Sequence, residues 1–132
     1  MKEMNNLTKK NILIVGGSGL IGSTLVGELL ASGANIISAD KNTKLLNSQK
    51  TLLKKNKNYF SSSIDITNLE SIKKTFEKSE KKFGKIDAVL NLAYPKNSNF
   101  GKNFWDVTID SFSENLSTHL GGYFLFMQQC AK

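Results

Sequence analysis

A chain of 132 residues with 39% hydrophobic side chains has room for one globular domain and not for two. Its single proline argues against a long disordered segment. The formal net charge of +7 comes from lysines scattered over expected surface helices, and arginine, the preferred residue for reading bases, is absent, so nucleic acid is not expected as a partner.

The most informative stretch is the first apolar segment and the glycines that follow it. Residues 11–16 form a short β-branched run typical of a buried parallel strand. Gly16, Gly19 and Gly22 follow at three-residue spacing, and an apolar-periodic segment begins at once. This order predicts a strand, a tight phosphate-binding turn and a helix. We expect Gly16 to permit the turn, Gly19 to let the backbone approach a pyrophosphate, and Gly22 to let the helix pack closely on the sheet.

The remaining segments alternate between helical and strand periodicity. In chain order we expect a helix ending at Ser32-Gly33, a strand at 35–40, a helix at 43–55, a strand near 59–64, a helix ending at Gly84, a buried strand at 86–92, a loop at 93–107, and a helix from about Ile109 to the end. Strand and helix alternation implies an α/β fold, a Rossmann-like doubly wound parallel sheet of strand order 3-2-1-4 with helices on both faces.

Apolar side chains at helical spacing predict which face of each helix packs on the sheet. They are Ile21, Leu25 and Leu29 in the first helix, Leu45, Leu46, Leu52 and Leu53 in the second, and Leu69, Ile72, Phe76 and Phe83 in the third. Thr67 and Glu70 at the start of the third helix match a capping box, in which each side chain accepts a hydrogen bond from the free backbone N–H of the other residue.

Polar residues end three of the expected strands. Asp40 could accept both hydroxyls of an adenosine ribose and repel a 2′-phosphate, which favours NAD over NADP, or it could be a solvated turn carboxylate. Lys41 beside it could tolerate a phosphate. Asp65 could accept a hydrogen bond from an adenine amino group or serve as a helix-start acid, and both interpretations stay open. Asn91 could tie neighbouring strands together and line the cofactor cleft.

The last helix carries the only histidine. His119 shares a helix face with Asn115 and Tyr123, each four residues away, and a lone helical histidine is more often structural than catalytic. We expect Tyr123, Phe124 and Phe126 to be core or interface aromatics. No cluster of metal-ligating residues is visible in the sequence.

The motifs resemble a known family. Gly16–Gly22, Asp40, Asp65–Thr67, Gly84–Ala93 and Gly122–Phe124 occur in the order found in the short-chain dehydrogenase/reductase family. The resemblance covers essentially the whole chain. The loop and the last helix look most like a branch linked to flagellin modification and sialic-acid-like sugar synthesis.

The resemblance implies an NAD(P)-dependent oxidoreductase that transfers hydride to or from an alcohol or carbonyl group, a sugar being one candidate substrate. It implies NAD rather than NADP as cofactor, a small-molecule substrate, no membrane partner, and a homo-oligomer. The cofactor-binding residues it implies are Gly16, Gly17, Ser18, Gly19, Leu20, Ile21, Gly22, Asp40, Lys41, Asp65, Ile66, Asn91, Leu92, Ala93 and Tyr94.

The sequence departs from the family pattern at several positions. Val15 replaces the usual threonine before the first glycine, and Tyr94 stands where a glycine usually lies beside the nicotinamide site. His119 falls where many members carry an asparagine of the catalytic tetrad, and Asn115 lies one turn earlier. Either residue could support the proton relay, and the resemblance does not assign the role to one of them.

The largest departure is an absence. Family members are about twice as long, and their catalytic serine and Tyr-x-x-x-Lys pair lie beyond the length of this chain, which contains no Tyr-x-x-x-Lys. We therefore expect residues 1–132 to be one NAD(P)-binding domain, truncated before the catalytic half and inactive alone. The alternatives are a nucleotide-sugar epimerase or dehydratase of the same superfamily, or a non-catalytic dinucleotide-binding module. The lone Cys130 and the polar stretch Met1–Lys10 favour a cytoplasmic location over secretion.

Overall fold

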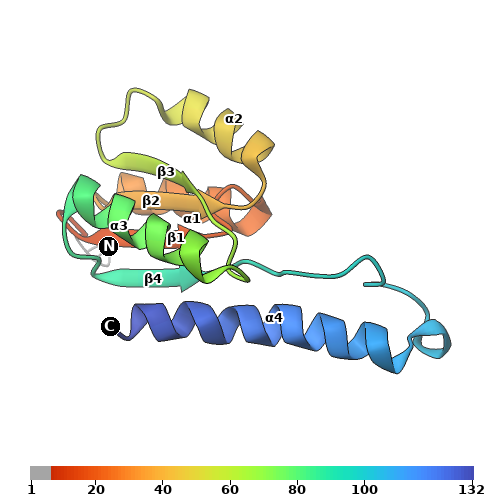
Figure 1. The fold of residues 1–132 in the computed structure, drawn as a ribbon. Coiled ribbons are helices and arrows are strands. Elements are labelled where there is room, and N and C mark those ends of the chain that lie inside the picture. Colours follow the sequence, from red (N-terminus) through yellow and green to blue (C-terminus); the bar gives the residue numbers. More distant parts are fainter. Residues whose placement is uncertain (1–6) are drawn as a thin grey trace, which may run out of the picture.

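A four-stranded parallel sheet with helices on both faces forms the centre of the computed structural model, which describes residues 7–132 (Figure 1). Residues 1–6, part of the polar stretch used above for the expected location, lie outside the described residues. The elements are β1 (Asn11–Val15), α1 (Leu20–Ala31), β2 (Asn35–Asp40), α2 (Thr43–Leu53), β3 (Tyr59–Ser63), α3 (Leu69–Phe83), β4 (Ala88–Asn91), the 3-10 helix η1 (Phe104–Asp106) and α4 (Ile109–Cys130).

The sheet has the order β3-β2-β1-β4, so the predicted α/β class and strand order are confirmed. β1 lies between two partners: Leu13 is in register with Ile37 of β2 and with Val89 of β4. All five residues of β1 are buried, as a strand covered on both faces requires. Because all pairs are parallel, the carboxyl ends of the four strands meet at one edge of the sheet.

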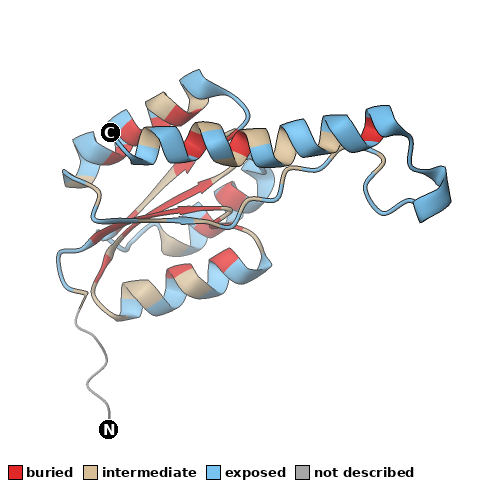
Figure 2. Cartoon of the chain, turned by 90° about the horizontal axis from the view of Figure 1, so that it is seen from below, coloured by how far each residue is buried: buried red, intermediate tan, exposed pale blue. Residues whose placement is uncertain are grey.

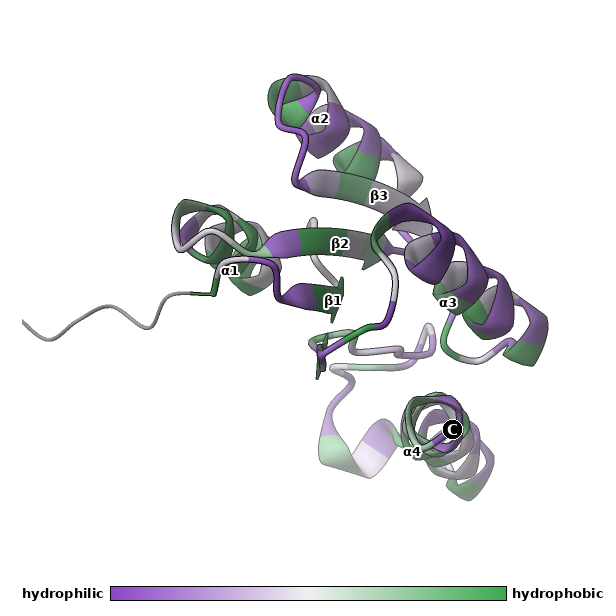
Figure 3. Cartoon of the chain, turned by 90° about the vertical axis from the view of Figure 1, so that its left-hand side faces the viewer, coloured by the Kyte–Doolittle hydropathy of each residue, from purple (hydrophilic) through white to green (hydrophobic). Residues whose placement is uncertain are grey.

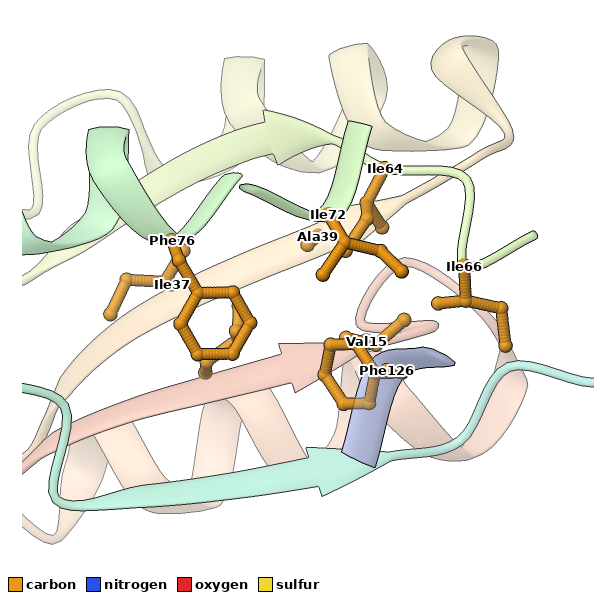
Figure 4. Packing of buried hydrophobic residues seen from close by; sticks show 9 residues of the cluster. Val15, Ile37, Ala39, Ile64, Ile66, Ile72, Phe76 and Phe126 are labelled. Carbon is orange, nitrogen blue, oxygen red and sulfur yellow. The ribbon is translucent and has the colours of Figure 1, made fainter. Parts of the chain in front are cut away.

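Alternate residues of the strands supply two separate cores. Ile12 and Ile14 point to one face, where they pack with Val26 of α1. Leu13 and Val15 point to the other face, toward α3 and α4. Figure 3 shows α1 on one side of the sheet and α3 and α4 on the other. On this second face Phe76 and Phe126 lie with ring centroids 5.9 Å apart and join the two helices above the strands (Figure 4).

All three predicted helix faces are wrong in part. Ile21 is 66% exposed, because α1 turns Gly22 and Val26 toward the interior and Ile21 lies about 100° away around the helix. In α2 the buried positions are Leu46 and Gln49, whereas Leu45 and Leu52 face solvent. In α3 Ile72 and Phe76 are buried as predicted, and Leu69 is exposed. The longer apolar face predicted for each helix therefore extends past the area that the sheet covers.

The predicted capping box is also wrong. The residue that caps α3 is Asn68, whose Oδ1 accepts a hydrogen bond of 3.0 Å from the backbone N–H of Ser71. Thr67 lies one residue before this N-cap position, and its hydroxyl donates to Asp65 instead, at 2.7 Å. Glu70 forms an ion pair with Lys73 on the helix surface. The predicted C-terminal ends of α1 and α3 hold, since Ser32 and Gly84 are their C-cap residues. The second helix is shorter than predicted, because α2 ends at Leu53 rather than at residue 55.

The fourth strand is shorter and less buried than predicted. β4 begins at Ala88 rather than at residue 86, and Ala88 and Leu90 are exposed. Val89 packs against the core on the face that α3 and α4 cover. On the opposite face, none of the described helices covers β4, so the alternate side chains lie open. A sequence of apolar residues could not distinguish this edge position from a central one.

The predicted loop at 93–107 contains the single turn η1, and the last helix begins at Ile109 as predicted. Figure 2 shows this loop and the first half of α4 extending beyond the sheet, with mostly exposed residues. Among the described residues, no helix combines the length and apolarity that crossing a membrane would need.

The two leucines of α2 provide a test of this packing. Leu46 is 5% exposed and Leu52 is 83% exposed, on the same helix. Leu46→Ala should lower the free energy of unfolding by about 2–5 kcal/mol, because it leaves a cavity. Leu52→Ala should change it by no more than about 0.5 kcal/mol. Urea denaturation of both variants measures the difference, and equal losses would contradict the orientation of α2.

Candidate functional site

A cleft of about 560 Å³ opens at the carboxyl edge of the sheet. Its walls come from the segments that follow all four strands: the end of β1 with its glycine turn, and the residues after β2, β3 and β4. The lining residues are Val15, Gly16, Gly19, Asp40, Lys41, Asn42, Ile64, Asp65, Ile66, Leu92, Ala93, Tyr94, Pro95 and Lys96. In open α/β sheets this edge is where ligands bind.

The glycine turn forms one wall. Gly16 has a φ of +78°, a left-handed conformation that side-chain-bearing residues rarely adopt. Its N–H and that of Gly17 donate to the carbonyl of Ala39, at 2.8 and 3.2 Å, which ties the turn to β2. A Cβ at Gly16 would lie 2.9 Å from the carbonyl carbon of Leu92. Glycine is therefore required there both by the dihedral angle and by the close approach of the segment after β4.

Gly22 and Gly19 serve different purposes. A Cβ at Gly22 would collide with the carbonyl oxygen of Gly16 and lie 2.7 Å from Cα of Gly17. The close contact expected between this glycine and the sheet is therefore a contact with the turn itself. A Cβ at Gly19 would meet only the carbonyl oxygen of Gly16, at 3.3 Å, and Gly19 lines the cleft. The absence of a side chain at Gly19 keeps the cleft open beside the backbone.

The N-terminus of α1 adds positive potential to this wall. Gly19 precedes the helix and offers no side-chain cap, and the first turn carries no acidic residue. Leu20 and Ile21, in that turn, are 91% and 66% exposed and do not line the cleft. The first N–H groups of a helix lack partners within the helix, and together with the helix dipole they favour an anion. The arrangement suits a phosphate group.

Asp40 is tied to the glycine turn rather than free. Its Oδ2 accepts hydrogen bonds from the backbone N–H and the hydroxyl of Ser18, at 3.1 and 2.7 Å, and its Oδ1 accepts one of 2.9 Å from the N–H of Asn42. A carboxylate has about four acceptor positions, so about one remains, on Oδ1. Acceptance of two ribose hydroxyls requires the Ser18 hydroxyl to turn away.

Lys41 and Asp65, which both line the cleft, form an ion pair. Their Nζ and Oδ2 atoms are 2.7 Å apart, and Oδ1 of Asp65 accepts hydrogen bonds from the N–H and the hydroxyl of Thr67. Partial burial raises the pKa of Asp65, but the hydrogen bonds from Lys41 and Thr67 outweigh it and hold the pKa below its ordinary value. Asp65 closes a turn ahead of α3 and is not part of the first helical turn.

The wall after β4 consists of the segment from Leu92 to Lys96, which includes Ala93 and Tyr94. Asn91 does not line it. Its Oδ1 accepts a hydrogen bond of 3.2 Å from the N–H of Ala93, so the side chain stabilises its own segment. Gly17, Ser18 and Gly22 also lie behind the lining, where they shape the turn. Only some residues of each predicted segment thus face the cleft, and sequence reasoning did not distinguish them from the residues behind the lining.

His119 and Asn115 contact the loop rather than the cleft. The His119 ring lies between two tyrosines, with centroids 4.2 Å from Tyr94 and 4.6 Å from Tyr123. Burial raises the pKa of Tyr123, whose hydroxyl donates to the carbonyl of Ala93 at 2.7 Å. Asn115 accepts a weak hydrogen bond of 3.4 Å from the backbone of the same loop. These side chains of α4 hold the loop against the sheet.

One residue of the site was missed by sequence reasoning. Gln49 of α2 is 9% exposed and its amide donates to the carbonyl of Gly17, at 2.8 Å. The only indication in the sequence was that Gln49 lies three residues after Leu46, on the same face of the helix. A search for apolar periodicity does not detect a polar residue at such a position. Ser38 of β2 belongs to the same network. In the part of the chain that the structure describes, no group of three or more histidine, cysteine or acidic residues is placed to hold a metal.

The fold is that of the Rossmann-like class of α/β domains, with a cleft at the carboxyl edge of its sheet. Two solved structures share the fold: a short chain dehydrogenase from Bacillus anthracis (TM-score 0.82, 23% identity, 96% of this chain and 50% of that one) and a short-chain dehydrogenase/reductase from Brucella melitensis (TM-score 0.80, 21% identity, 93% and 51%). The family model for short chain dehydrogenases matches residues 10–132. The chain belongs to this short-chain dehydrogenase family.

Among curated relatives, the chain is 33% identical to the post-translational flagellin modification protein A of Campylobacter coli. That match covers 96% of this chain and 50% of the relative. The chain thus spans about half the length of this relative and of the solved structures it resembles. The resemblance to the short-chain dehydrogenase/reductase family is confirmed, and this relative has a name that belongs to the branch suggested by the motifs.

Two glycines of α1 test the contact between helix and turn. Gly22→Ala should destabilise the protein by about 1–3 kcal/mol, because the new methyl group overpacks a contact between backbones. At Gly27 a methyl group would have no other atom within 4 Å, so Gly27→Ala should stabilise the helix by up to about 1 kcal/mol. Thermal unfolding measures both, and a neutral Gly22→Ala would contradict the close contact.

Proposed function

We propose that this chain is the cofactor-binding part of an NAD(P)-dependent oxidoreductase that acts on an alcohol or carbonyl group of a small molecule. One observation carries the proposal: the glycine turn, the uncapped N-terminus of α1 and the carboxylate of Asp40 meet in one cleft. Membership of the short-chain dehydrogenase family supports it.

The residues present fit a dinucleotide. The open side of Gly19 and the start of α1 would hold the pyrophosphate, and Asp40 would hold the adenosine ribose. Asp65 and Ile66 would border the adenine, and the segment at 92–94 would border the nicotinamide. When bound, the nicotinamide supplies or accepts the hydride. The chain's own residues bind and orient it, and Tyr94 narrows that end of the cleft.

For the whole protein, we propose that a serine and a Tyr-x-x-x-Lys pair outside residues 1–132 carry out proton transfer, so that this chain alone is inactive. His119 and Asn115 would act as positioning residues through the loop that they contact. The relative named for flagellin modification supports a role in that modification, with a sugar as a candidate substrate. The epimerase, dehydratase and non-catalytic alternatives have no observation in their favour.

We also propose that the whole protein is a cytoplasmic homo-oligomer. One face of α4 carries four exposed apolar side chains: Leu116, Leu120, Phe124 and Met127. A contiguous apolar patch of this kind on a folded domain is typical of an interface. The same helix buries Phe126 on its opposite side, so the exposed face is available to a second copy.

Gly19→Val tests the cofactor site, and its Cβ would lie 3.3 Å from the carbonyl oxygen of Gly16, which requires a small shift of the turn. Gly19 has a φ of −73°, which any residue adopts, and a side chain there would enter the cleft. We expect NAD affinity to fall at least about tenfold, or 1.4 kcal/mol, measured by calorimetry on the complete protein. Gly27→Ala, on the same helix but outside the cleft, should leave it unchanged. Unchanged affinity in a folded Gly19→Val variant would contradict the proposed function.

The complete protein should bind NAD more tightly than NADP. A 2′-phosphate would face the Asp40 carboxylate, at a cost of roughly 2–4 kcal/mol. Lys41, the nearest cation on this segment, is paired with Asp65. We expect Asp65→Asn to release Lys41 and reduce the preference for NAD by about threefold.

Titration of both nucleotides measures this preference. In the double variant Asp65→Asn, Lys41→Met the reduction should disappear, since the cation is gone. Equal or tighter NADP binding by the unaltered protein would show that Asp40 does not determine the preference.

A further inference from the structure

A buried polar network lies beneath the glycine turn. The side chain of Gln49 donates to the carbonyl of Gly17, and its Oε1 accepts hydrogen bonds from the hydroxyls of Ser38 and Tyr59, at 2.6 and 3.0 Å. All three side chains are buried, and Ser38 is fully so. The network joins α2, β2 and β3 to a turn that lies 32 residues earlier in the chain than Gln49.

The same peptide unit is held from its other side. The carbonyl of the Gly17–Ser18 peptide accepts from Gln49, and its N–H donates to Asp40, at 3.1 Å. Both polar groups of this peptide are thus bound to side chains, one from α2 and one from the end of β2. A peptide unit held at both groups cannot rotate without breaking two hydrogen bonds, so the direction of the turn is set.

The chemistry of the network requires an amide at this position. The Gly17 carbonyl needs a donor, and the two hydroxyls use an acceptor. Glutamine provides both without a charge, whereas a carboxylate would lack the donor and an apolar side chain would lack both. Each buried polar group left without its partner would carry the full cost of its desolvation.

We propose that Gln49 is a positioning residue for dinucleotide binding: through the Gly17–Ser18 peptide it keeps the turn and Asp40 aligned toward the pyrophosphate and the ribose. Gln49 itself does not line the cleft, so its effect passes through the turn. This inference rests on the proposed function and adds to it a residue outside the cleft that determines cofactor affinity.

The test compares Gln49→Met with Tyr59→Phe in the complete protein. Gln49→Met removes the hydrogen bond to Gly17, and NAD affinity measured by calorimetry should fall about tenfold. Tyr59→Phe removes one hydrogen bond from the same network and destabilises the protein, but it leaves Gln49 bound to Gly17. Its NAD affinity should stay within about twofold of the unaltered protein.

A second measurement needs no cofactor. Amide hydrogen exchange at Ser18 should accelerate in Gln49→Met and not in Tyr59→Phe, because only the first variant frees the peptide. If Gln49→Met does not fold, Gln49→Leu provides the same loss of hydrogen bonds with a different shape.

If the unaltered protein binds NAD and the two variants show equal NAD affinity and equal amide exchange at Ser18, the proposed role of Gln49 is wrong. The proposed function would not be affected by that result. Failure of the unaltered protein to bind NAD or NADP would overturn the proposed function and this role together.

Discussion

The parallel pairing of β1 with β2 on one side and with β4 on the other is the constraint on which the rest of the structure depends. It places a fully buried strand at the centre and sends the chain after β1 into a cleft between its neighbours. The segments after β2, β3 and β4 reach the same edge because the strands are parallel. Every residue proposed to contact a cofactor lies on one of these four segments or at the start of α1.

The approach of backbone to backbone at this edge explains the need for glycine. Gly16 comes within contact of the segment at Leu92, and Gly22 comes within contact of Gly16. These contacts bring three separate elements together around a turn that has almost no side chains of its own. The conformation of such a turn must be held by neighbouring residues. Here the Gln49 amide donates a hydrogen bond to the Gly17 carbonyl, and the Ser18 N–H donates one to Asp40.

The cleft lining has no net charge although the chain is basic, because it contains two carboxylates, Asp40 and Asp65, and two lysines, Lys41 and Lys96. The chain carries a formal +7, yet at the end of the cleft proposed for ribose and adenine Asp40 and Asp65 lie beside a single lysine, Lys41, which is paired with Asp65. Over such short distances the local charges outweigh scattered surface lysines, which salt screens. The proposed preference between NAD and NADP therefore depends on how these three side chains pair, and a count of charges does not reveal it.

The sequence by itself determined the order of the elements and the glycine turn, because periodicity and the dihedral needs of glycine are local properties. The strand order was predicted from the Rossmann-like alternation of strands and helices along the whole chain. The sequence also placed Asp40 at the end of β2. Only the tertiary structure decided that Ile21 faces solvent, that Lys41 pairs with Asp65, and that Gln49 binds a carbonyl 32 residues away. These outcomes depend on which surfaces meet when the helices pack on the sheet, and no short stretch of sequence contains that information.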